Sequence, residues 1–147
     1  MHRTAQVAAC GQSLKQSWAL LLERSMSRTH AVVMAGPDEI IRHWDAGAEQ
    51  FFGYTAAEAI GRSLDFIVPE EFLERHQEGF RNAVATRTCK LHGAAICIPV
   101  KCKDGTIEAF PARFVFLQGA RGDVVGFSAL YSERTGIETA FGPVFDF

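Results

Sequence analysis

The chain has 147 residues, of which 48% are hydrophobic and 22% charged, with a formal net charge of −2. This length and apolar content suit one folded domain and exclude a disordered chain. Lysine and arginine are scattered, which argues against nucleic acid as a partner, and no apolar run is long enough for a membrane span or a signal peptide. The four cysteines form no CxxC pair, so we expect reduced thiols in a cytoplasmic protein.

The N-terminal region predicts an amphipathic helix, because apolar side chains recur at helical spacing within residues 12–28. Its apolar face holds Leu14, Trp18, Leu21 and Leu22. This face needs a surface to cover, either on the same domain or on a second subunit. We therefore treat residues 1–28 as a helical extension that mediates homodimerisation or packs on the domain.

Residues 30–36 and 40–44 predict two short strands, because β-branched runs flank a Gly-Pro-Asp turn. The next segment predicts a helix with Asp45 as its N-cap and Gly53 as its stop.

A capping box follows, in which Thr55 is the N-cap and Glu58 stands three residues later, and Gly61 ends that turn. Residues 69–86 then predict a longer helix. Pro69 stands at its start, where a missing N–H group costs nothing.

Beyond residue 88 the pattern indicates three strands, at 94–102, 107–117 and 124–132. The turn at 103–106 contains Asp-Gly, which is a strong hairpin signal, and the glycine-rich loop at 119–123 indicates a second hairpin. The order of two strands, several short helices and three antiparallel strands predicts an α+β fold.

The middle strand of these three has an aromatic face. Period-two alternation places Phe110, Ala112, Phe114 and Phe116 on that face. Such a face must be covered, and the short helices are the elements available to cover it.

This arrangement resembles a PAS domain over roughly residues 29–135. The residues that carry the resemblance are Trp44, the GAE and FGY triplets at 47–49 and 52–54, the turn from Glu58 to Gly61, Pro69, and the Lys-Asp-Gly turn at 103–105. The resemblance implies a five-stranded antiparallel sheet in the order B-A-E-D-C, with helices over one face and a ligand-sized space between them. It also implies an ion pair between Glu49 and Lys103.

The segment Ser-Glu-Arg-Thr at 132–135 stands where PAS domains carry an exit motif that leads into an output module. Here residues 136–147 form only a short tail, so we expect a stand-alone sensor or a fragment of one. Such a sensor would signal to a downstream protein that the sequence does not identify.

The resemblance also implies a candidate cofactor, haem b, with His76 as the iron ligand. In haem-binding oxygen-sensor PAS domains the ligand lies on the helix after the Pro-Glu turn, and His76 has their spacing, seven residues after Pro69 and ten before Thr86. The other residues predicted to form the apolar slot are Phe80, Val84, Ile98, Phe110, Phe114, Phe116 and Leu130. The cations predicted to meet the propionates are Arg87, Lys90 and His92.

Two observations bear on the signal. Ile96 stands where the oxygen-binding branch has an arginine beside the bound gas, so the preference among diatomic gases stays open. The letters FLQG at 116–119 occur in flavin photosensors, but these need a cysteine two residues upstream, where this chain has Phe114.

Two alternatives to haem remain open from the sequence. One is a small apolar or aromatic ligand, and the other is a cofactor-free module for protein–protein interaction and dimerisation. We expect no enzyme, because no GxSxG, Walker loop or HExxH motif occurs.

Overall fold

The structure, a computed structural model, describes residues 29–133. Its elements are β1 (His30–Ala35), β2 (Ile41–Trp44), α2 (Ala46–Phe52), α3 (Ala56–Ala59), the 3-10 helix η1 (Leu64–Ile67), α4 (Glu70–Thr86), β3 (Ala95–Lys101), β4 (Ile107–Gln118) and β5 (Val124–Ser132). The predicted N-terminal helix and the tail at 136–147 lie outside the described residues. Among the elements described, η1 is the one that the sequence did not predict.

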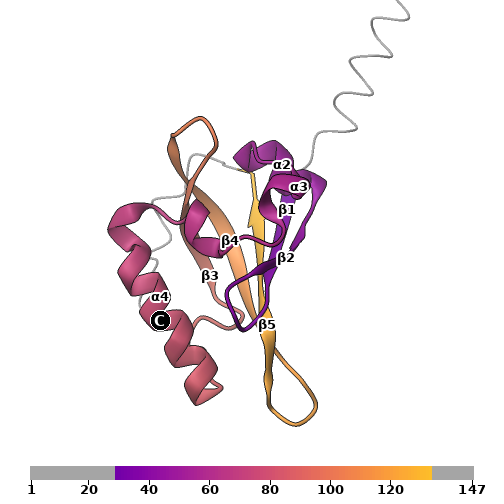
Figure 1. Cartoon of the computed structure of the whole chain (residues 1–147), viewed down its shortest axis with the longest axis vertical. Coiled ribbons are helices and arrows are strands. Elements are labelled where there is room, and N and C mark those ends of the chain that lie inside the picture. Colours follow the sequence, from indigo (N-terminus) through magenta and orange to yellow (C-terminus); the bar gives the residue numbers. More distant parts are fainter. Residues whose placement is uncertain (1–28, 134–147) are drawn as a thin grey trace, which may run out of the picture.

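The five strands form one antiparallel sheet in the order β2-β1-β5-β4-β3. This is the order B-A-E-D-C, so the predicted topology and the α+β class are confirmed. The last strand, β5, lies at the centre and pairs with both β1 and β4. In Figure 1, α4 runs along one side of the sheet, while α2 and α3 lie near one end, beside β1.

The start of α2 is fixed to the sheet by the side chain of Asp45. Its Oδ1 accepts hydrogen bonds from the backbone N–H of Ala48, at 2.8 Å, and of Val32 in β1, at 3.0 Å. The helix ends at Gly53, whose φ of +86° is in the left-handed region that glycine tolerates best. Both predicted helix signals are therefore confirmed.

The capping box of α3 is also confirmed, and it corrects the predicted ion pair of Lys103. The Glu58 Oε2 atom accepts from the Thr55 backbone N–H at 2.8 Å. Its other oxygen, Oε1, meets Lys103 Nζ at 2.6 Å, so the lysine pairs with Glu58 and not with Glu49. The prediction was wrong because the capping box already holds the Glu58 carboxylate within reach of the hairpin turn.

The predicted aromatic face of β4 is confirmed, and two clusters cover it. In the first, Phe52 of α2 is 1% exposed and packs edge-on against Phe110, with ring centroids 5.2 Å apart. In the second, Phe80 of α4 packs on Phe127 of β5 at 4.1 Å, next to Phe116.

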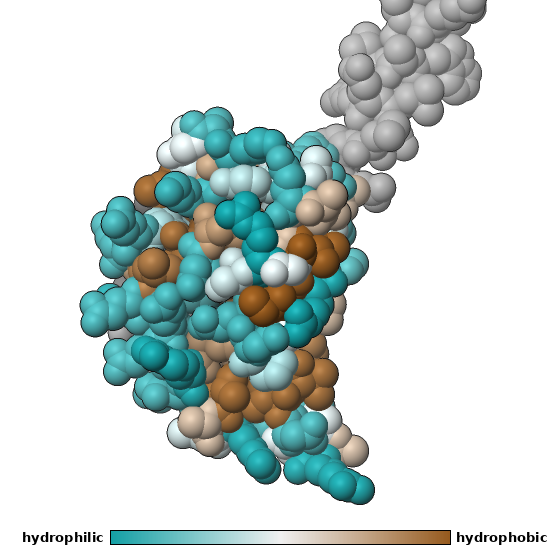
Figure 2. Space-filling model, viewed as in Figure 1, coloured by the Kyte–Doolittle hydropathy of each residue, from teal (hydrophilic) through white to brown (hydrophobic). Residues whose placement is uncertain are grey.

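The second cluster anchors α4 through the middle of the helix, since the buried residues of α4 are Gly79, Phe80 and Ala83. The outer surface of α4 is mostly hydrophilic on the face that Figure 2 shows. The first part of α4, from Glu70 to His76, contains no fully buried residue. It lies beside a cavity.

Candidate functional site

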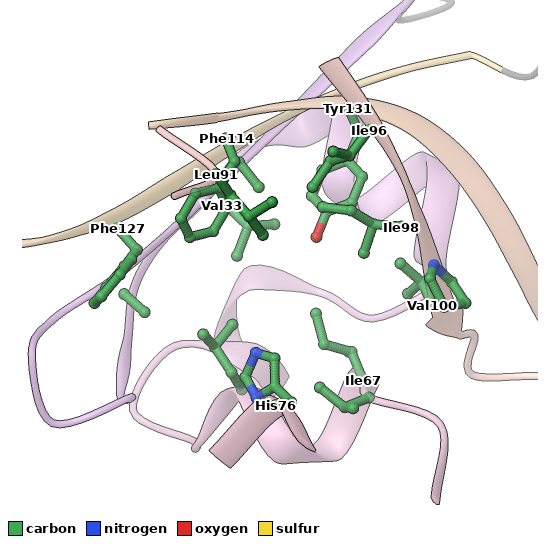
Figure 3. Close-up of a pocket in the computed structure, with 15 residues that line it drawn as sticks. Val33, Ile67, His76, Leu91, Ile96, Ile98, Val100, Phe114, Phe127 and Tyr131 are labelled. Carbon is green, nitrogen blue, oxygen red and sulfur yellow. The ribbon is translucent and has the colours of Figure 1, made fainter. Parts of the chain in front are cut away.

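A cavity of about 60 Å³ lies between the inner face of the sheet, η1 and the first half of α4 (Figure 3). Its lining comprises Val33, Ala35, Leu64, Ile67, Val68, His76, Leu91, Ile96, Ile98, Pro99, Val100, Phe114, Phe127, Ala129 and Tyr131. Thirteen of these fifteen residues are apolar. The two that carry polar side-chain groups are His76 and Tyr131.

The space exists because a small residue stands between two aromatic ones on the central strand. Phe127, Ala129 and Tyr131 alternate along β5 and all three are buried. Ala129 is flanked in the sheet by Val33 of β1 and Phe114 of β4. A methyl side chain at this position leaves the volume that a larger residue would fill.

The Tyr131 side chain brings a hydroxyl group into this apolar space. The residue is 4% exposed, and its ring packs edge-on against Phe52 with centroids 5.0 Å apart. Figure 3 shows the hydroxyl oxygen pointing into the cavity. No described residue forms a hydrogen bond with it. Burial raises the pKa of Tyr131, so the hydroxyl is neutral and can both donate and accept.

The His76 side chain forms part of the opposite wall. It projects from α4, and one of its ring nitrogens faces the cavity in Figure 3. Burial lowers the pKa of His76, and the nearby charge of Asp65 opposes this shift without reversing it. The imidazole is therefore neutral at neutral pH, which is the form that binds metals and accepts hydrogen bonds.

Two carboxylates lie next to His76, and neither lines the cavity. Glu39 lies in the turn between β1 and β2, and Asp65 lies in η1. One carboxylate oxygen of each residue and one ring nitrogen of His76 lie within 4.8 Å of one another. Gln77 donates to Asp65 Oδ2 at 2.8 Å. Burial raises the pKa of Glu39, the charge of Asp65 adds to that shift, and Arg81 opposes it.

The structure places the predicted site residues in different parts of the domain. His76, Ile98 and Phe114 line the cavity, as does Ile96. The remaining core residues lie in the clusters beside the cavity rather than in its wall; they are Phe80, Val84, Phe110 and Phe116.

The prediction for Leu130 was wrong. Its neighbours Ala129 and Tyr131 point into the core, so period-two alternation turns Leu130 to the other face of the sheet, where it is 38% exposed.

The predicted propionate partners lie at the surface. Arg87 and Lys90 are exposed. The Nδ1 atom of His92 accepts a hydrogen bond from the Phe116 backbone N–H at 3.0 Å, so this ring already holds β4.

The cavity is too small for a haem in this conformation. Pockets that hold drug-sized molecules have volumes of roughly 300–1,000 Å³, and haem exceeds most such molecules, whereas this cavity has about 60 Å³. His76 has the burial and the neutral state of an iron ligand, but the packed side chains around it leave no slot for a macrocycle. A haem would therefore enter only if α4 moved away from the sheet.

Among the described residues, none of the helices has both the length and the apolar content needed to cross a membrane.

Comparison with solved structures finds PAS domains. A PAS domain from Colwellia psychrerythraea has a TM-score of 0.60 at 22% identity, over 79% of this chain and 98% of that one. The PAS-B domain of Drosophila melanogaster Cycle, solved with bound ethylene glycol, has a TM-score of 0.54 at 12% identity, over 69% and 97%. An RNA-binding Light-Oxygen-Voltage receptor has a TM-score of 0.53 at 23% identity, over 78% of this chain and 32% of that one. At these identities the similarity shows the fold alone.

Sequence comparison gives two further findings. An uncharacterized protein of Azorhizobium caulinodans is 29% identical over 100 residues, which are 67% of this chain and 13% of that protein, so the chain spans a small part of that relative. The family model described as the PAS fold matches residues 26–137, most of the chain. The chain thus belongs to the PAS family, whose fold serves sensing and signalling and is typically not catalytic.

Proposed function

We propose that this PAS domain senses a small, mostly apolar molecule that carries one hydrogen-bonding group. The observation that supports the proposal is the Tyr131 hydroxyl, which is buried, faces an apolar cavity and forms no hydrogen bond with any described residue. A buried polar group without a partner is costly. A ligand that supplied the partner would recover this cost.

The volume of the cavity limits the size of the ligand. One water molecule needs about 10–15 Å³ on this measure, so 60 Å³ holds about four to six. A ligand with a similar number of non-hydrogen atoms enters without rearrangement of the walls. The apolar lining then selects for a hydrocarbon body, and the hydroxyl of Tyr131 selects for a polar end.

The packing of α4 suggests how occupancy becomes a signal. Phe80 holds the middle of this helix on Phe127, while His76, one turn earlier, borders the cavity. A ligand that presses on His76 therefore moves the first half of α4 more than the second half. We propose that this shift changes homodimerisation, or contact with a downstream protein, through segments that include residues 1–28.

The test compares two probes of equal heavy-atom count, 1-butanol and 1-chlorobutane, by NMR chemical-shift titration. The wild type is expected to prefer the alcohol. Tyr131→Phe should bind 1-butanol about three- to tenfold more weakly, because one hydrogen bond is lost. Its affinity for 1-chlorobutane should change little. Ala129→Leu should weaken both probes by filling the cavity. Ile107→Ala, at an exposed position of β4, is the matched control.

Two results would count against the proposal. One is a wild type that binds neither probe, which would favour the cofactor-free interaction module. The other is an Ala129→Leu variant that still folds and still binds both probes like the wild type.

Haem gives a separate prediction. Because the cavity is far smaller than a haem, we expect haem titration of the wild type to give no Soret band that depends on His76. Absorbance spectra of the wild type and of His76→Ala, recorded under the same conditions, check this. A strong band that the wild type shows and His76→Ala lacks would mean that α4 moves away from the sheet to admit the cofactor.

A further inference from the structure

The cluster of Glu39, Asp65 and His76 is a second feature of this region. Its members come from the β1–β2 turn, η1 and α4, three parts of the chain that the fold brings together. Glu39 and Asp65 do not line the ligand cavity. We propose that these three side chains bind one divalent transition-metal cation, at a site that shares only His76 with the wall of the ligand cavity.

The distances suit this assignment. One ligand atom from each side chain lies within 4.8 Å of the other two. Atoms bound about 2.1 Å from a shared zinc ion lie about 3–3.5 Å apart. Rotamer adjustments of about 1 Å therefore convert the observed cluster into a coordination site, without movement of the backbone.

Two buried oxygen atoms give an independent reason to expect a cation. Glu39 Oε1 and Asp65 Oδ1 are shielded from solvent, and no described residue donates a hydrogen bond to either. Gln77 satisfies only the other oxygen of Asp65, at 2.8 Å. Buried carboxylate oxygens normally have hydrogen-bond donors or bind metal ions. A cation bound by these two carboxylates would supply the electrostatic partner that the described residues do not.

The ligand set selects the type of metal. Two carboxylates and one imidazole are a mixed oxygen and nitrogen set, which suits Zn²⁺, Co²⁺ or Mn²⁺. Ca²⁺ and Mg²⁺ prefer oxygen ligands alone. Three protein ligands leave at least one coordination position for water.

The experiment titrates the full chain, with any affinity tag removed, with Zn²⁺ alone by calorimetry. We expect one equivalent to bind to the wild type. Glu39→Gln and Asp65→Asn keep the shape of each side chain and remove its charge, and each should weaken binding at least tenfold. Glu74→Gln, an exposed carboxylate on the same helix as His76, is the matched control and should bind like the wild type.

Two further measurements make the result decisive. Zn²⁺ should raise the melting temperature of the wild type and of Glu74→Gln, but not that of Glu39→Gln or Asp65→Asn. Without metal, these two cluster variants should melt at a temperature no lower than that of the metal-free wild type. The Co²⁺ spectrum should lack thiolate charge-transfer absorption, which excludes a site built on cysteines. Equal Zn²⁺ affinity in the wild type, Glu39→Gln and Asp65→Asn, no binding to the wild type, or a thiolate-type spectrum would each overturn the assignment.

Discussion

Replacing Phe52 with alanine is expected to lower the free energy of unfolding by about 3–5 kcal/mol, the range for truncating a buried phenylalanine. The side chain is 1% exposed and joins α2 to three parts of the core. Its ring centroid lies 5.5 Å from that of Trp44, 5.2 Å from Phe110 and 5.0 Å from Tyr131. Alanine would leave a cavity and remove all three aromatic contacts. Since whole domains have about 5–15 kcal/mol of stability, this variant should be close to unfolding at 37 °C.

Urea unfolding, followed by circular dichroism, measures the effect. Phe51→Ala is the matched control, because Phe51 is the preceding residue and of the same type but only partly buried, with its ring stacked on Phe110 at 5.5 Å. We expect a clearly smaller loss for Phe51→Ala. Equal losses for the two variants would contradict the central role of Phe52.

The second large effect is expected for Gly47→Ala, because α2 packs backbone to backbone on β1 at this residue. A Cβ atom on Gly47 would lie 1.9 Å from the carbonyl oxygen of His30 and 2.9 Å from its carbonyl carbon. Backbone atoms cannot rotate away as side chains do, so the helix must move and the Asp45 cap must loosen. We expect a loss of about 2–4 kcal/mol, above the usual range for overpacking because the clash is with backbone.

Thermal and urea unfolding of Gly47→Ala test this expectation. Ala46→Ser is the control, because it adds an atom to the adjacent, exposed position of α2 and should change stability by about 0.5 kcal/mol or less. A Gly47→Ala variant as stable as the wild type would mean that α2 can shift away from β1 without loss.

Local signals in the sequence predicted most of the helices and turns, because the residues that form each cap or turn are close together in the chain. The Asp45 cap, the box of Thr55 and Glu58, and the Asp-Gly turn each act over a few residues, and the structure contains all of them. The strand order required more than local signals. It came from the resemblance to a PAS domain, since periodicity alone does not say which strands pair.

The site was less predictable, for physical reasons. The alternation along β4 found Phe114, but the same alternation applied to β5 would have excluded Leu130 and indicated Tyr131. The small volume of this cavity could not be read from the sequence, because it depends on how Phe127 packs against α4 and on which side chains surround Ala129 in the wall. The Glu39–Asp65–His76 cluster joins residues up to 37 positions apart, and no spacing rule links them.

The position of Tyr131 within β5 has a mechanical consequence. Its hydroxyl faces the cavity, and the strand ends at the next residue, Ser132, which pairs with His30 at the start of β1. The proposed ligand contact and the last residue of β5 are therefore joined by a single peptide bond. In addition to the proposed shift of α4, a displacement of the Tyr131 backbone by an occupant of the cavity would change the direction of the chain at Glu133, two residues further along.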